Sequence, residues 1–290
     1  MLSMAVDVPA AWEALDTRSL QGLLMVLGEM DSGKSTFARY LYQRLSADGL
    51  TAFLDSDPGQ SSLGPPTTQT LSLGRPGETD FPPRGPCWRR FVGSTSPARH
   101  LLPMLVGAAR LVQQARKAGA GRVVMDTSGM VHAEGGGREL KLAKVELLRP
   151  AVVFAIQRED ELEALLTPLQ RSRRVRVVRL HPSPAVQRRS REQRRAHRRR
   201  RYMEHFAGAR EIELDWTRLA VFPGPRFSLH RLAACEDRQG VTQALAIVTG
   251  CDRLQGRVRL LTPLQSLEAI TALRLGDVRV DPHSFEDRQI

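Results

Sequence analysis

The chain has 290 residues, of which 41% are hydrophobic and 26% charged, as in an ordinary globular protein. Its 43 basic and 31 acidic residues give a net charge of +12, which favours a polyanionic partner. No apolar run could span a bilayer, and residues 1–16 do not resemble a signal peptide, so we expect a cytoplasmic protein without a membrane partner. Three scattered cysteines without CxxC spacing predict free thiols and not a metal site.

The predicted elements alternate between strands and helices. After a lead-in over residues 1–19, we expect strands at 20–28, 51–55, 122–126, 151–156 and 175–180. The helices expected with them lie at 34–47, 97–118, 138–148 and 159–169. This alternation predicts an α/β fold with a doubly wound, mostly parallel sheet. Residues 58–90 are rich in Gly, Pro, Ser and Thr and predict a long functional loop, with or without short strands.

The second half of the chain changes character. A very basic helix is expected over about 185–207, followed by a small β-rich domain over 211–290. In that domain we expect strands at 243–248 and 257–261 and a helical piece at 264–270. We therefore divide the chain into the lead-in 1–19, a main P-loop domain 20–210 that includes the basic helix, and the C-terminal domain 211–290.

A phosphate-binding loop follows the first strand. Residues 28–36 read GEMDSGKST and match the pattern GxxxxGK(S/T) between an apolar strand and an amphipathic helix. Backbone N–H groups of such a loop surround the β-phosphate of ATP or another NTP, Lys34 reaches the β- and γ-phosphates, and Ser35 supplies a hydroxyl to Mg²⁺. The nucleotide-binding residues expected are Gly28, Glu29, Met30, Asp31, Ser32, Gly33, Lys34, Ser35 and Thr36. The alternative is a chance glycine-rich turn, and the loop alone does not define the reaction.

Two strand ends carry carboxylates. Asp55 and Asp57 are two residues apart and point to one face of an extended chain. Asp57 can orient or deprotonate an attacking hydroxyl, or hold the metal through water, whereas the alternative is a turn that caps the strand. Asp126 ends the strand RVVMD, as in a Walker B motif, and is either a metal ligand or an N-cap for the turn that follows. The expected metal set is Ser35, Asp57 and Asp126.

Four segments in order, GEMDSGKST, LDSDPGQ, FVGSTSP and DTSGM, resemble the polynucleotide 5′-hydroxyl kinase family. That family includes the RNA kinase subunit of the eukaryotic mRNA 3′-end cleavage machinery, the kinase of pre-ribosomal RNA processing and archaeal RNA kinases. The resemblance covers about residues 20–207. It implies transfer of the γ-phosphate of ATP, with Mg²⁺, to the 5′-OH end of RNA or DNA, with Lys34 on the phosphates and Asp57 as the general base.

The resemblance also implies an acceptor side. Gln60 lies beside the general base. Residues 91–97 match a clasp loop that holds the nucleic-acid end in the family. Considered without the resemblance, Ser94–Ser96 is the N-cap of the helix that follows. Met130 stands where the family has a base-stacking aromatic after its TxG turn, with Trp88 or Phe91 as alternatives. The acceptor-binding residues expected are Asp55, Gln60, Ser94, Thr95, Ser96 and Met130.

Fourteen arginines lie between residues 171 and 201. Three interpretations of this run are open. It is a solvated helix face, a surface that binds nucleic acid, or a lid over ATP whose arginines stabilise charge on the transferring phosphoryl group. The family's lid arginines match Arg194, Arg195 and Arg198 best, which lie on one helical side. Two other functions stay open: a nucleotide-dependent switch, and a nucleic-acid-binding scaffold without kinase activity.

Overall fold

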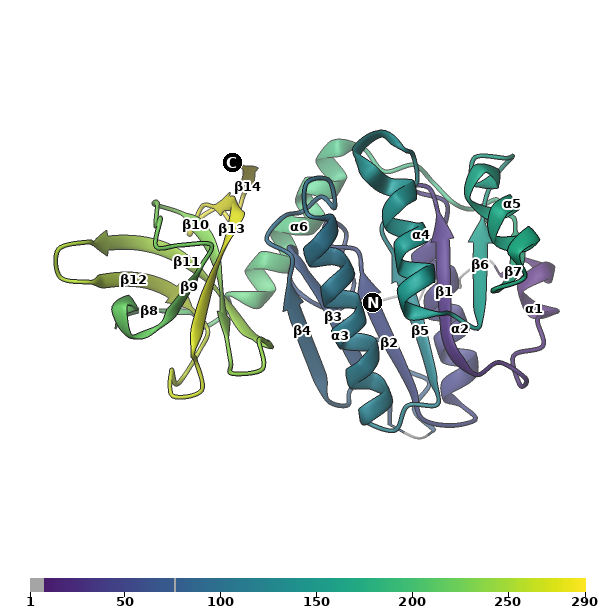
Figure 1. Cartoon of the computed structure of the whole chain (residues 1–290), viewed down its shortest axis with the longest axis horizontal. Helices are drawn as coiled ribbons and strands as arrows, with labels where there is room; N and C mark the ends of the chain where they lie inside the picture. Colours follow the sequence, from purple (N-terminus) through teal and green to yellow (C-terminus); the bar gives the residue numbers. More distant parts are fainter. Residues whose placement is uncertain (1–7, 76) are drawn as a thin grey trace. The chain divides into compact units, whose positions relative to one another are not determined.

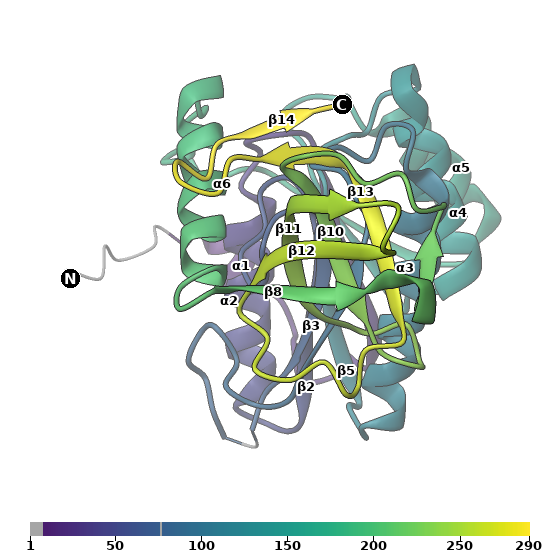
Figure 2. The same ribbon diagram turned by 90° about the vertical axis from the view of Figure 1, so that its left-hand side faces the viewer.

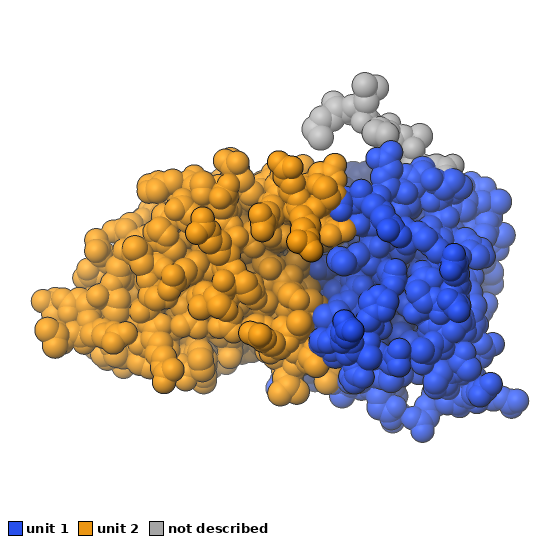
Figure 3. Space-filling model, turned by 90° about the horizontal axis from the view of Figure 1, so that it is seen from above, with its two compact units in different colours: residues 1–57, 71–87, 108–189 blue, residues 58–70, 88–107, 190–290 orange. Residues whose placement is uncertain are grey.

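The computed structural model describes residues 8–75 and 77–290; residues 1–7 of the expected lead-in lie outside the described residues. The chain forms two compact units that interleave along the sequence. Unit 1 consists of residues 1–57, 71–87 and 108–189, and unit 2 of residues 58–70, 88–107 and 190–290 (Figure 3). The domain boundary at residue 210 stays a prediction, and the units are described separately below.

The α/β sheet has the strand order β4-β3-β2-β5-β1-β6-β7. The strands paired around its centre, all parallel, are β1 (Gly22–Gly28), β2 (Thr51–Ser56), β5 (Arg122–Thr127), β6 (Val152–Ile156) and β7 (Arg176–Leu180). β3 (Thr68–Leu73) and β4 (Cys87–Phe91) complete the sheet beyond β2. Every residue of β2 and β6 is buried, which agrees with the apolar runs expected of a parallel sheet with two covered faces.

Helices cover both faces of this sheet. α2 (Lys34–Ser46) lies on one face and α4 (Gly137–Leu148) on the other (Figures 1 and 2). α1 (Ala10–Glu13), α3 (Leu101–Lys117), α5 (Glu163–Ser172) and a 3-10 turn at Glu134–Gly136 complete the helical elements before residue 190. Phe37 of α2 packs between Trp12 and Phe154, with ring centroids 5.0 and 5.2 Å away. The doubly wound P-loop fold is confirmed.

The β-rich region is also confirmed, as a seven-stranded sheet with the order β14-β13-β10-β11-β12-β8 and with β9 paired to β13. Its strands are β8 (Arg210–Asp215), β9 (Ala220–Phe222), β10 (Arg231–Glu236), β11 (Thr242–Asp252), β12 (Arg257–Thr262), β13 (Ala272–Val280) and β14 (Asp287–Gln289), with a 3-10 turn at Trp216–Arg218. Alternate residues of β10 enter cores on opposite faces, so both faces of the sheet are covered.

The basic helix packs on one of these faces. It is α6 (Arg191–His205), and its Tyr202 together with the following Phe206 joins the core that also holds Phe91. The expected start near residue 185 is wrong. Ser190 forms a capping box with Gln193 and starts the helix, and Pro182 and Pro184 precede it in an irregular segment.

Residues 264–270 do not form the expected helix. They are an irregular segment after Pro263, in which Leu264, Leu267 and Ile270 pack against the sheet core. The apolar side chains recur every three residues, as they do on one face of a helix. Here they belong to a loop, and the same spacing lets them pack against the sheet.

Candidate functional site

The phosphate loop has the geometry that its motif predicts. β1 leads into it and α2 leaves it, with Gly33 at the N-cap in the left-handed region at φ 85°. A Cβ on Gly28 would lie 2.4 Å from Ser32 Oγ and 2.6 Å from the carbonyl oxygen of Ile156, so only glycine fits there. Lys34 is buried, and its ammonium donates to the carbonyl of Glu29. The N–H groups at the start of α2 therefore face a loop suited to phosphate.

Asp126 ends β5 between the strands that carry the other acidic and phosphate-binding groups. It is in register with Val26 of β1 and with Asp55 of β2. Burial raises the pKa of Asp126 to about 7; Asp55 adds to the shift, and a hydrogen bond with Ser35 opposes it. Its Oδ1 is buried and has no hydrogen-bond partner among the described residues. A buried carboxylate oxygen beside a hydroxyl suits Mg²⁺, which prefers such hard oxygen ligands.

Asp55 and Asp57 occupy the end of β2. Asp55 is buried, and its Oδ1 accepts a hydrogen bond from the backbone N–H of Asp57 at 3.2 Å, while Asp57 is half-buried. Burial lowers the pKa of Lys34, and Asp126 and Asp57 oppose that shift. The two strand ends and the phosphate loop therefore form one electrostatic cluster within unit 1.

Two lysines that the sequence reading missed join this cluster. Lys141 and Lys144 of α4 are fully buried. Lys144 Nζ donates to Ser56 Oγ at 2.7 Å, and Lys141 Nζ donates to the carbonyl oxygen of Ser128 at 2.7 Å and to its Oγ at 3.3 Å. Burial lowers the pKa of Lys144 to about 7 and the pKa of Lys141 well below its usual value, and Asp57 opposes both shifts. The sequence does contain a sign of their burial, because both lysines occupy core positions of an amphipathic helix, next to Leu140 and Val145.

The turn after β5 lies against the phosphate loop. A Cβ on Gly129 would lie 2.5 Å from the backbone N of Met30 and 2.7 Å from its Cα. His132 Nε2 pairs with Glu29 at 2.8 Å. Met130 is half-buried, and its role as a base platform stays a prediction. Phe91 is excluded as a substitute, because it is buried in the core of unit 2, within van der Waals reach of Gly276.

The other acceptor-side residues lie in unit 2, where α6 holds the loop that follows Asp57. Gln60 Nε2 donates to the carbonyl of Gly59 at 2.8 Å, and His197 Nε2 lies 2.9 Å from the carbonyl of Ser61. Arg201 donates to the carbonyls of Leu63 and Gly64 at 2.6 and 2.9 Å. The bonds from His197 and Arg201 fix the backbone of residues 61–64 to one side of α6.

The clasp segment is tied to the C-terminal strands. Gln289 of β14 donates to Ser94 Oγ at 2.6 Å, and the N–H of Asp277 donates to the carbonyl of Gly93 at 2.7 Å. Ser94 and Ser96 accept bonds from the N–H groups two residues further on, whereas α3 begins only at Leu101. The interpretation of Ser94–Ser96 as the cap of that helix is therefore wrong, because these hydroxyls close local turns.

The lid arginines differ in their surroundings. Arg198 Nε donates to both carboxylate oxygens of Asp287 at 3.0 and 2.9 Å, and the two side chains are only 15% and 6% exposed. Arg199 donates to the carbonyl of Ser284 at 2.8 Å. Arg195 is exposed and Arg194 half-buried. Arg198 therefore anchors α6 to β14, whereas Arg195 is exposed.

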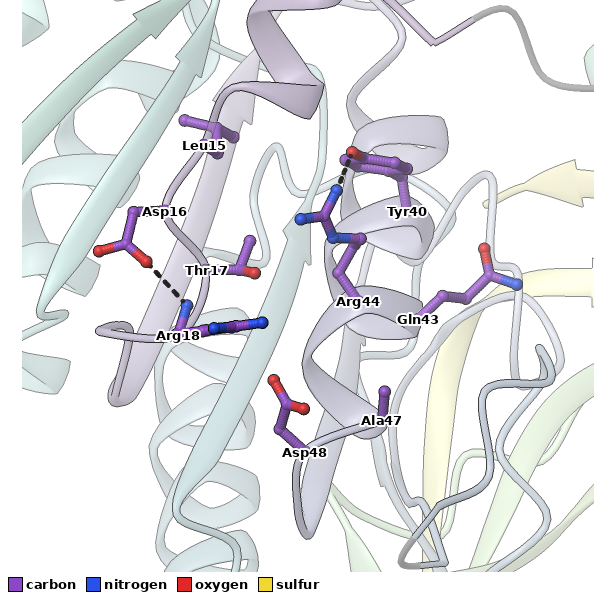
Figure 4. Close-up of a pocket in the computed structure, with 9 residues that line it drawn as sticks. All are labelled: Leu15, Asp16, Thr17, Arg18, Tyr40, Gln43, Arg44, Ala47 and Asp48. Carbon is purple, nitrogen blue, oxygen red and sulfur yellow. Dashed lines mark hydrogen bonds between the residues drawn. The ribbon is translucent and has the colours of Figure 1, made fainter.

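A pocket lies at the opposite end of α2 from the phosphate loop. It encloses about 680 Å³ and is lined by Leu15, Asp16, Thr17, Arg18, Tyr40, Gln43, Arg44, Ala47 and Asp48 (Figure 4). Two hydrogen bonds join residues of its lining: Asp16 accepts from the N–H of Arg18 at 3.1 Å, and Arg44 donates to the hydroxyl of Tyr40 at 2.9 Å. None of the predicted site residues lines it.

The fold and this site define a P-loop nucleotide-binding protein. The model of the P-loop family of mRNA cleavage and polyadenylation factor CLP1 matches residues 28–208, and the chain belongs to that family. The polyribonucleotide 5′-hydroxyl-kinase of Pyrococcus horikoshii is 25% identical over 93% of this chain and 89% of its own length. That of Thermococcus kodakarensis is 28% identical over 91% and 89%.

One further match is shorter, and another shows the fold alone. The polyribonucleotide 5′-hydroxyl-kinase of Pyrococcus furiosus is 30% identical over 76% of this chain and 61% of its own length. The solved structure of a wild-type Clp1p–Pcf11p complex aligns with 89% of this chain and 74% of that chain, with a TM-score of 0.66 and 14% identity. Within residues 8–75 and 77–290, no helix has the length and apolarity that a membrane crossing requires.

Proposed function

We infer that this chain is an ATP-dependent polynucleotide 5′-hydroxyl kinase that transfers the γ-phosphate of ATP to the 5′-OH end of RNA. The observation that carries this inference is the cluster of Lys34, Asp57 and Asp126 around a phosphate loop of the right geometry. The kinases of Pyrococcus horikoshii and Thermococcus kodakarensis, which match 93% and 91% of the chain, support RNA as the acceptor. The net charge of +12 agrees with a polyanionic acceptor.

In the donor half of the reaction, residues 28–36 bind the phosphates of ATP and Lys34 contacts the β- and γ-phosphates. Ser35 and Asp126 would hold Mg²⁺, with Asp57 near it through water. The ion would neutralise charge on the phosphate oxygens. Lys34 already lies within the field of both carboxylates, which oppose the loss of its proton. The carboxylates thus partly offset the effect of burial and favour the charged form of Lys34 that binds phosphate.

In the acceptor half, Asp57 takes the proton of the attacking 5′-hydroxyl, since phosphoryl transfer needs little more than a base, positioning and charge neutralisation. We assign the seating of the nucleic-acid end to Asp55, Gln60, the clasp residues Ser94–Ser96 and Met130. Arg194 and Arg195 are assigned to the charge of the transferring phosphoryl group. We give Arg198 a positioning role, because its guanidinium pairs with Asp287.

A transfer assay with labelled γ-phosphate tests the function on matched RNA and DNA oligonucleotides with 5′-OH ends. We expect transfer to RNA, loss of at least about 100-fold in Asp57→Ala, and loss of both transfer and nucleotide binding in Lys34→Ala. Full transfer by Asp57→Ala would remove the base assignment. Tight ATP binding by the wild-type chain without transfer to any 5′-OH oligonucleotide would favour a nucleotide-dependent switch or a scaffold.

A further inference from the structure

The two buried lysines of α4 have no part in the function as described so far. Lys141 and Lys144 are both fully buried. Each donates to a residue beside a catalytic carboxylate: Lys144 to Ser56, the residue before Asp57, and Lys141 to Ser128, two residues after Asp126. Both ammonium groups also lie within the field of Asp57. The pair therefore links one face of α4 to both acidic strand ends.

Burial of two ammonium groups disfavours folding unless they are compensated, and an apolar side chain of similar volume would usually pack there at least as well. The neighbouring core positions of α4 hold Leu140, Val145 and Leu148, so the helix could have an entirely apolar buried face. Fold stability alone therefore gives no reason for lysine at these two positions.

The residue type is informative as well. The chain contains only four lysines against 39 arginines, so its composition strongly favours arginine as the cation. Three of the four, Lys34, Lys141 and Lys144, are buried in the cluster around the phosphate loop, and Lys117 is exposed. An ammonium is a compact point charge with three rotatable donors, whereas a guanidinium is a large planar fork. These buried positions therefore suit the compact amino group of lysine better than the larger guanidinium of arginine.

We propose that Lys144 and Lys141 are positioning residues for phosphoryl transfer: Lys144 holds the strand end that carries Asp57 through Ser56, and Lys141 holds the turn after Asp126 through Ser128. The inference rests on the proposed function and deepens it. Asp55, Asp57 and Asp126 crowd one edge of the sheet, and like charges in a buried site repel each other. The hydrogen bonds of the two lysines oppose displacement by this repulsion and keep the base and the metal-binding carboxylate in their places before the substrates arrive.

Lys144→Met tests the role of Lys144, and Lys117→Met is the matched control on an exposed lysine. We expect Lys144→Met to lower kcat for a 5′-OH RNA oligonucleotide about 100-fold, as a misplacement of the base by about 1 Å would. The Kd for ATP and the folded fraction should stay near the wild-type values, and Lys117→Met should leave all three unchanged. Loss of kcat only in proportion to lost folded protein or lost ATP binding would overturn the proposal.

Ser56→Ala keeps the test decisive if Lys144→Met folds poorly, and a double-mutant cycle adds to it if both variants fold. Ser56→Ala removes the acceptor of the lysine without removing a charge. It should lower kcat in the same direction, and the total loss in the double variant Ser56→Ala/Lys144→Met should be smaller than the product of the two single losses. Wild-type kcat in Ser56→Ala, or strictly multiplicative effects, would overturn the proposal. Absence of transfer by the wild-type chain would instead refute the proposed function.

Discussion

Gly129 offers a sharp test of how closely the turn after β5 controls the phosphate loop. An added Cβ would lie 2.5 Å from the backbone N of Met30, whereas ordinary contacts begin near 3.4 Å. The turn or the loop must therefore shift by about 0.9 Å in Gly129→Ala. Overpacking of this kind costs about 1–3 kcal/mol, and a shift of about 1 Å near the reacting groups can cost about 100-fold in rate. Because the clash is with backbone, no change of side-chain rotamer can relieve it.

The assay for Gly129→Ala combines ATP binding by calorimetry with single-turnover transfer to a 5′-OH oligonucleotide. We expect ATP affinity to fall about 10-fold or more and transfer to fall further. Gly49→Ala is the matched control, since a Cβ on Gly49 meets nothing within 4 Å and this glycine has no positive φ. Wild-type affinity and rate in Gly129→Ala would refute the view that this turn fixes the position of the loop.

Two further predictions concern charge. Because the pKa of Asp126 is raised to about 7, the folded state binds an extra proton between about pH 4 and pH 7, and stability falls as pH rises through that window. Asp126→Asn should lose this pH dependence in thermal unfolding without ligands, and an unchanged pH profile would contradict it. In unit 2, Arg198→Met leaves the carboxylate of Asp287 buried without its guanidinium and should cost about 3 kcal/mol of stability, seen in chemical unfolding. Arg195→Met should lower kcat and leave the free energy of unfolding unchanged. If Arg195→Met lowered the stability and Arg198→Met lowered only kcat, Arg198 would be the catalytic arginine and Arg195 the anchor.

The phosphate loop and both acidic strand ends follow from the sequence because they depend on local order. An apolar strand, a glycine pattern and an amphipathic helix fix Gly28, Lys34 and Ser35 with respect to each other. In a parallel sheet the carboxyl ends of the strands lie at one edge, so both carboxylates were expected there, whereas the pairing of β2 with β5 that brings Asp55 beside Asp126 comes from the structure.

The buried lysines and the anchor of α6 do not follow in the same way. A lysine on a helix ordinarily predicts a solvated position, and only the facing Ser56 and Ser128 identify Lys144 and Lys141 as buried donors. Arg198 and Asp287 are 89 residues apart in sequence, and β14, which carries Asp287, has only three residues. Neither local periodicity nor composition contains information about such a contact.

The arginine run shows why net charge is a poor measure of an acceptor-binding surface. Arg198, Arg199 and Arg201 direct their guanidinium groups to a carboxylate or to backbone carbonyls within unit 2. Arg200 lies near Glu204 at 3.6 Å, as an exposed pair one helical turn apart. Several charges in this helix are therefore already engaged by the protein, so only part of the +12 is available to phosphates. The exposed Arg195 can meet an incoming phosphate without first breaking a buried pair, which is why the catalytic assignment favours it over Arg198.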